Sequence, residues 1–171
     1  MTMKEFFELG KNLLLLLVVA LVLIFVGQTI SLTPKAGQEP VRPSSTMALV
    51  TRVIDGDTVV IEGGKSVRLL GIDADEKDGP CYEEASERLE ELILNKQVML
   101  ERELRDGDVY GRLLRYIFFD GQNVDLQLVK EGLVSARASY EGGVYDKEFA
   151  DAEYAAKLAR IGCKWSLTLK P

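Results

Sequence analysis

Short runs of β-branched and other apolar residues recur through the second part of the chain, separated by glycines, aspartates and other charged residues. Two adjacent glycines, Gly63 and Gly64, separate two of these runs, which is a strong signal for a hairpin. The pattern predicts strands over residues 48–54, 58–61, 66–72, 97–104, 111–119 and 133–136.

Three other segments carry apolar residues at the spacing of a helix. Pro80 suits the start of the first helix, and Gly132 occupies the position at which a helix commonly ends. The predicted helices cover residues 82–94, 124–131 and 146–160, with Ala85, Leu89, Leu92 and Ile93 facing inward in the first and Phe149, Ala152, Ala156 and Ala159 in the third.

The order of these elements suggests a known architecture. Five short antiparallel strands with a helix between the third and the fourth resemble an OB-fold barrel. We therefore expect an α+β protein, in which residues 47–171 form a five-stranded OB-fold β-barrel with about three helices.

The first part of the chain differs from the rest. Residues 12–34 contain no charged side chain, and these 23 positions exceed the roughly 20 residues that span a bilayer. We expect a flank over 1–11, a transmembrane signal-anchor helix over 12–33 and a flexible Pro-rich linker over 34–46. This organisation predicts a membrane-anchored protein with its folded domain outside the cytoplasm. A cleaved signal peptide, which would release a secreted protein, is the alternative.

Composition limits the chemistry. The sequence has no histidine, which excludes imidazole bases and histidine-ligated zinc. The net charge of −6 disfavours tight, non-specific binding of nucleic acid, so a nucleic-acid site would need a local cluster of arginines. Two cysteines, Cys81 and Cys163, are expected to form a disulfide outside the cytoplasm. Two buried thiols that never meet are the alternative.

Carboxylates gather at the predicted strand ends. Asp57 opens the second strand and Asp73 closes the third, its hairpin partner, so both lie at the same end of the hairpin. Together with the backbone carbonyl of Ala74 they could bind a hard cation such as Ca²⁺, and Glu76 follows close by. The simpler interpretations are a turn at Asp55-Gly56 and a solvated acidic loop.

Two arginines also stand out. Arg68 lies within an apolar strand and Arg112 precedes another, and a guanidinium binds phosphate oxygens through two parallel hydrogen bonds. The remaining arginines of this region, Arg102, Arg105 and Arg115, are expected to be solvated. Two arginines beside a cation suggest metal-assisted cleavage of a phosphodiester.

The combined motifs resemble the staphylococcal nuclease (thermonuclease) family over roughly residues 48–167. The resemblance rests on the spacing of Asp57, Arg68, Asp73, Glu76 and Tyr110-Gly111-Arg112, together with Glu84-Ala85-Ser86, Val129-Lys130-Glu131-Gly132-Leu133 and Trp165.

This resemblance implies a monomeric OB-fold nuclease that uses Ca²⁺ to hydrolyse DNA or RNA and leaves 3′-phosphate ends. By position, the metal ligands would be Asp57, Asp73 and Ala74, and the catalytic residues would be Glu76 as general base or water-positioning group and Arg68 and Arg112 on the phosphate. Tyr110 would hydrogen-bond a terminal phosphate, and Tyr140 would stack on a base.

Three positions depart from the family pattern. Ala74 and Asp75 stand where members of the family usually carry Thr-Pro, and Asp75 adds a charge that either tightens metal binding or repels phosphate. Val109 replaces a lysine and removes a phosphate contact. The alternative function is a non-catalytic OB-fold module that binds nucleic acid or protein. The presence of all five charged site residues favours the enzyme.

Overall fold

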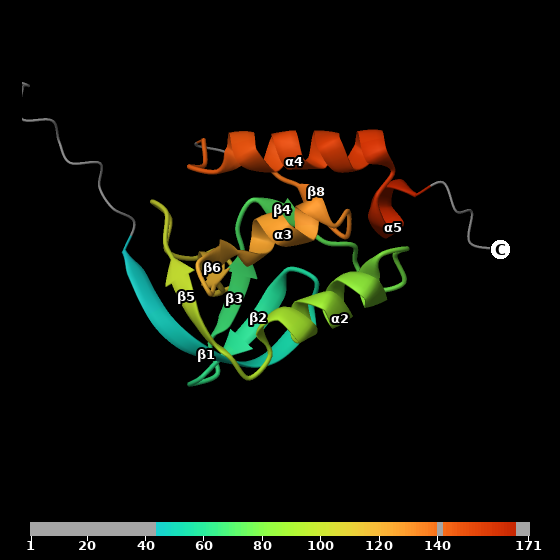
Figure 1. Cartoon of the computed structure of the whole chain (residues 1–171). Coiled ribbons are helices and arrows are strands. Elements are labelled where there is room, and N and C mark those ends of the chain that lie inside the picture. Colours follow the sequence, from blue (N-terminus) through green and yellow to red (C-terminus); the bar gives the residue numbers. More distant parts are fainter. Residues whose placement is uncertain (1–43, 140–141, 167–171) are drawn as a thin grey trace, which may run out of the picture. The chain divides into compact units, whose positions relative to one another are not determined.

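A closed barrel of five strands forms the centre of the computed structural model, which describes residues 44–139 and 142–166 (Figure 1). The strands are paired in the order β3-β2-β1-β5-β6, and a parallel pairing between β3 and β6 closes the barrel. The predicted α+β barrel is therefore confirmed. Its strands are β1 (Ser45–Asp55), β2 (Thr58–Ile61), β3 (Ser66–Leu69), β5 (Gln97–Glu101) and β6 (Leu113–Phe119).

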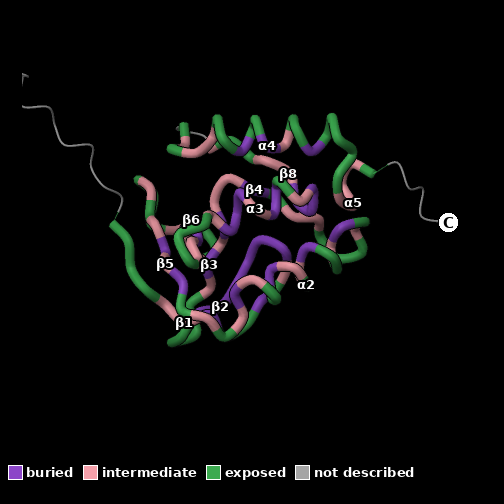
Figure 2. Tube along the Cα trace, viewed as in Figure 1, coloured by how far each residue is buried: buried purple, intermediate pink, exposed green. Residues whose placement is uncertain are grey.

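The long strand β1 belongs to both halves of the barrel. Its first half pairs with β5 and its second half with β2, and the pairing with β2 has two register irregularities, between Val50 and Arg52 and between Val53 and Asp55. Strict alternation would place Val50 and Val53, three positions apart, on opposite faces. The register irregularity between Val50 and Arg52 lets both valines enter the core while Thr51 and Arg52 stay exposed. Figure 2 shows that β2 is buried along its length while the start of β1 is exposed.

Helices pack on more than one side of the barrel (Figure 1). In α2 (Tyr82–Ile93) the buried residues are Ala85, Leu89 and Ile93, as the periodicity predicted. In α3 (Val124–Lys130) the Asn123 side chain accepts a hydrogen bond from the Leu126 N–H, and α3 packs against both β6 and α4. The remaining helices are α4 (Asp146–Ala159) and the single turn α5 (Gly162–Trp165).

The third predicted strand is interrupted. Gly71 has a φ of +76°, and a Cβ at this position would lie 2.5 Å from the Phe149 ring, so only glycine fits the bend. The chain therefore leaves β3 at Leu69 and forms a short strand, β4 (Ile72–Asp73), which pairs with β8 (Ser135–Ala136).

Other element boundaries also differ from the predicted ones. The first strand begins at Ser45, within the segment predicted as linker, while β5 ends at Glu101 and β6 begins at Leu113. Two elements were not predicted, namely α5 and the two-residue strand β7 (Gln122–Asn123). Ala159 was expected to face inward but is exposed, because α4 ends there.

The predicted flank and signal-anchor lie outside the described residues, as does the linker up to residue 43. Within residues 44–139 and 142–166, no helix combines the length and apolar character needed to cross a bilayer.

Candidate active site

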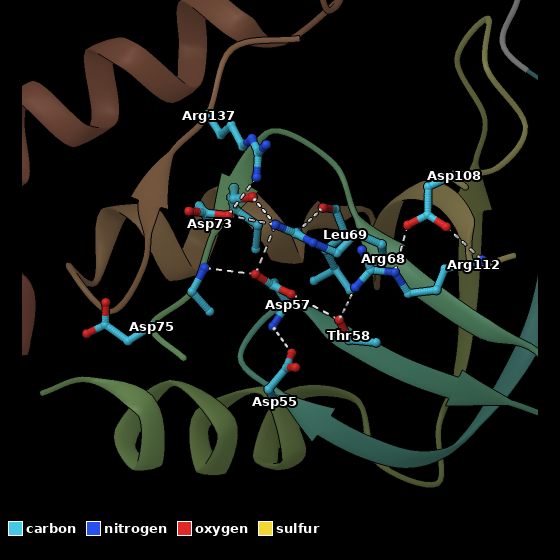
Figure 3. A network of polar contacts seen from close by, with 12 residues as sticks. Asp55, Asp57, Thr58, Arg68, Leu69, Asp73, Asp75, Asp108, Arg112 and Arg137 are labelled. Carbon is cyan, nitrogen blue, oxygen red and sulfur yellow. Dashed lines mark hydrogen bonds and ion pairs between the residues drawn. The ribbon is translucent and has the colours of Figure 1, made fainter. Parts of the chain in front are cut away.

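The centre of the candidate site is the guanidinium of Arg68, on which two carboxylates converge (Figure 3). Its Nη2 lies 3.0 Å from Asp57 Oδ2 and 2.9 Å from Asp73 Oδ1, so the two carboxylates lie close to each other. The same guanidinium donates to the carbonyls of Leu69 at 2.6 Å and Ile72 at 3.0 Å, which fixes its orientation. The structure thus brings Asp57, Arg68 and Asp73 together, while the roles predicted for them stay predictions.

Asp57 is buried and held on both sides. Its Oδ1 accepts from the Thr58 hydroxyl at 3.0 Å and its Oδ2 from the Ala74 N–H at 2.8 Å. Its own N–H donates to Asp55 Oδ1 at 3.0 Å, which closes the tight turn. Burial raises the pKa of Asp57, and the neighbouring Arg68 opposes that rise. Asp57 thus presents a fixed carboxylate beside the Ala74 backbone.

The turn before Asp57 allows α2 to approach the site closely. A Cβ on Gly56 would lie 2.7 Å from the Ala85 Cβ and 3.0 Å from the Ala74 Cβ. Glycine at this position therefore lets the helix, the turn and the loop after β4 pack together.

Asp73 is open to solvent, with 53% of its side chain exposed. Pairing of β4 with β8 places it opposite Ser135. Its Oδ1 accepts from Arg137 Nη1 at 2.9 Å as well as from Arg68. Arg137 was not among the predicted site residues. The sequence signal that could have found it is an arginine directly after a predicted short strand.

Arg112 reaches the site from the turn before β6. Its Nε donates to Asp108 Oδ2 at 2.8 Å, and its Nη1 lies 3.4 Å from the Thr58 hydroxyl, which itself bonds Asp57. Its Cζ lies 5.6 Å from the centroid of the exposed Tyr110 ring. Asp108 and Thr58 were also missed by sequence reasoning, although an aspartate that bonds backbone N–H groups two and four residues on is a recognisable turn signal.

The loop after β4 carries Glu76 on the surface near Ala74. Glu76 is exposed, and its carbonyl accepts from the Gly79 N–H at 2.8 Å. Asp75 is turned away from the carboxylates and forms an ion pair with Lys164. Its Oδ2 accepts from the Cys81 N–H at 3.0 Å. Burial acts to raise the pKa of Asp75, but these two partners outweigh burial and lower it.

Lys164 thus neutralises the charge on which both sequence expectations for Asp75 were based. Arg115 requires a correction, since it was expected to be solvated but is 9% exposed. It donates to the Asp106 carboxylate at 2.7 Å and to the Asp106 carbonyl at 2.9 Å, and so closes the 106–115 turn.

Cys81 and Cys163 are joined by a disulfide with their Cα atoms 5.4 Å apart, which ties the start of α2 to α5.

Val109 is 92% exposed, and its apolar side chain cannot supply the phosphate contact that a lysine would make. Tyr140 lies outside the described residues, so its predicted stacking on a base stays a prediction.

Comparison with known proteins identifies the family. The family described as "Staphylococcal nuclease homologue" matches residues 66–166. Endonuclease YncB of Bacillus subtilis (strain 168) is 38% identical over 145 residues, which cover 77% of this chain and 68% of that protein. The chain belongs to the staphylococcal nuclease family.

Two further relatives of the family are similar to this chain. The thermonuclease of Staphylococcus intermedius is 34% identical over 144 residues, covering 76% of this chain and 82% of that protein. The SPbeta prophage-derived endonuclease YokF of B. subtilis is 38% identical over 126 residues, covering 67% of this chain but 42% of that protein. The family resemblance inferred from the motifs is thus confirmed.

The donor set suits a hard cation. In the described part of the chain, no group of three or more histidine, cysteine, aspartate or glutamate side chains could hold a metal ion. Asp57 and Asp73 nevertheless converge on one point, although each pairs there with the Arg68 guanidinium in this structure. Two carboxylates and a nearby backbone carbonyl provide oxygen ligands of the kind that Ca²⁺ prefers, with water as the remaining ligands. The donor types present therefore fit a hard divalent cation.

Proposed function

We propose that this member of the staphylococcal nuclease family hydrolyses DNA or RNA with the help of Ca²⁺ and leaves 3′-phosphate ends. One observation supports this proposal above the others. Asp57 and Asp73 meet at Arg68, and Arg112 joins the same network through Thr58. Carboxylates for a cation and arginines for a phosphate are thus within one polar network, as phosphodiester hydrolysis requires.

Asp57, Asp73 and the carbonyl of Ala74 would hold the ion. When bound, Ca²⁺ would stabilise the negative charge that grows on the phosphate during attack. Arg68 would bind one side of the phosphate, and the contacts of its guanidinium with the Leu69 and Ile72 carbonyls keep it in position without substrate.

Glu76 would accept a proton from the attacking water. As the new bond between the water oxygen and phosphorus forms, the bond from phosphorus to the 5′-oxygen breaks, which leaves the phosphate on the 3′-oxygen. Arg112 would favour departure of the 5′-oxygen by hydrogen-bonding it while that oxygen takes a proton from solvent water, and Asp108 orients the guanidinium for this contact.

The activity assay uses the full chain in detergent with single-stranded DNA, in Ca²⁺ or in chelator. We expect cleavage that requires Ca²⁺ and yields 3′-phosphate ends. Glu76→Ala should lower kcat by about 10²–10⁴-fold, as loss of a general base typically does. Lys65→Ala, a change at the exposed turn between β2 and β3, is the matched control and should leave the rate unchanged.

Intact DNA under both conditions, with folded protein, would contradict the proposed activity. Binding of oligonucleotide without cleavage in any divalent metal would favour the non-catalytic module instead.

The N-terminal segment supports a further proposal, that the nuclease is tethered to the membrane and faces away from the cytoplasm. Residues 12–34 are uncharged and long enough to span a bilayer. Protease added outside intact cells should digest the domain while the protein sediments with membranes. A soluble mature protein that starts after the apolar segment would instead indicate secretion.

A further inference from the structure

A third arginine, Arg137, lies beside the candidate site and has no role in the chemistry described above. It follows β8 directly, and its N–H donates to the Gly71 carbonyl at 2.9 Å. Its backbone is therefore fixed next to the bend that leads to Asp73. The Arg137 side chain extends from this point to Asp73 Oδ1, at 2.9 Å (Figure 3).

Arg137 and Arg68 share the same oxygen of Asp73 but differ in their freedom. The Arg68 side chain is 11% exposed and is also bound by two backbone carbonyls. The Arg137 side chain is 66% exposed, and among the described residues the contact with Asp73 is the polar side-chain contact found for it. Arg137 thus keeps most of its donors available to a ligand in solvent.

The three arginines occupy different sides of the site. Arg112 and Arg137 lie on opposite sides of Arg68 in Figure 3. In the proposed function, on which this inference rests, Arg112 contacts the departing 5′-oxygen. Arg137 is therefore on the side of the nucleotide that retains the phosphate.

We propose that Arg137 binds the phosphate that precedes the scissile one, on the 5′ side of the cleaved bond. The ligand class is a phosphodiester or a terminal phosphate of the same polynucleotide strand. In an acidic protein such a contact has to come from a local arginine, and a guanidinium matches phosphate oxygens with paired hydrogen bonds.

Thymidine dinucleotides with one cleavable bond test this assignment. The set comprises a dinucleotide without a terminal phosphate, one with a 5′-phosphate and one with a 3′-phosphate. The full chain with Ca²⁺ should show a kcat/KM about tenfold higher for the 5′-phosphorylated substrate than for the unmodified one, as a solvent-exposed charge-assisted hydrogen bond allows. Arg137→Ala should remove this factor and leave the other two substrates within about twofold of the wild type, while Lys65→Ala keeps it.

Two outcomes would overturn the assignment. If a 5′-phosphate does not raise the kcat/KM of the wild type, the assignment of Arg137 has no basis. An equal change on all three substrates, together with a changed Ca²⁺ requirement, would mean that Arg137 acts by pairing with Asp73 and not by binding substrate.

A binding measurement separates this inference from the proposed activity. In Glu76→Ala protein, log K for a single-stranded oligonucleotide falls with log salt concentration, and adding Arg137→Ala should reduce that slope by about 0.7, the value for one lost phosphate contact. If the wild type cleaves nothing, the proposed activity fails, and this slope alone decides the role of Arg137. An unchanged slope would contradict it.

Discussion

Removing the disulfide between Cys81 and Cys163 should destabilise the domain by several kcal/mol. The two residues are 82 positions apart. In the chain-entropy model, cross-linking a loop of this length reduces the freedom of the unfolded chain enough to contribute about 4.5 kcal/mol to stability at 25 °C. The native contacts of α5 do not depend on the sulfur atoms, because Lys164 bonds both the Gly132 carbonyl and Asp75. The loss should therefore come mainly from the unfolded state.

Urea unfolding, followed by circular dichroism, measures this effect. For a slope of about 2 kcal/mol per molar urea, the double variant Cys81→Ser and Cys163→Ser should unfold at about 2 M less urea than the oxidised wild type. Reduced wild type should match the double variant, and reductant should not change the double variant. If wild type with two free thiols, verified by mass, keeps the oxidised midpoint, the loop-entropy reasoning is wrong.

Three further predictions concern residues outside the catalytic groups. Asp125→Asn should stabilise the domain more at pH 8 than at pH 5. Burial raises the pKa of Asp125 well above 3.8, so the stability of the wild type falls as the pH rises from 3.8 to the folded-state pKa, whereas asparagine does not titrate. Equal shifts of the urea midpoint at both pH values would contradict this. Gly71→Ala should lower the free energy of unfolding by about 3 kcal/mol, because the new Cβ would clash with the Phe149 ring and alanine disfavours the positive φ at this position. A loss below about 1 kcal/mol in urea unfolding would refute this. Arg88 donates two hydrogen bonds to Glu131, at 2.8 and 2.9 Å. A double-mutant cycle to alanine should therefore give a coupling free energy of about 1 kcal/mol, because solvent screens this partly exposed pair. A coupling of zero would show that the pair does not stabilise the fold.

Local sequence signals predicted the hairpin that carries one half of the site. The hairpin between β2 and β3 was predictable from Gly63 and Gly64, and its register pairs Thr58 with Arg68. Asp57 directly precedes Thr58, so the hairpin brings its backbone beside β3. Alternation alone would place the Asp57 and Arg68 side chains on opposite faces, so their ion pair also requires the turn at Asp55 and the Ala74 N–H, which hold the Asp57 carboxylate.

The parts that sequence reasoning missed depend on contacts between distant segments. The bend at Gly71 is required by Phe149 of α4, and Asp75 is turned aside by Lys164 of α5. Arg115 is buried because Asp106 folds back over it. None of these partners is marked by local periodicity, since each lies in another element or across an irregular turn.

The site lies across the point where the barrel closes. Arg68 is opposite Thr58 in the antiparallel hairpin and opposite Leu114 in the parallel pairing of β3 with β6. Arg112, immediately before β6, therefore reaches the Thr58 hydroxyl only when this parallel pairing has formed. Parallel pairing joins segments distant in the chain and gains its hydrogen bonds only after the loop between them has been ordered. Closing the barrel and completing the arginine pair are thus the same structural event, so local opening between β3 and β6 would separate Arg112 from Arg68 while leaving the hairpin with Asp57 and Arg68 intact.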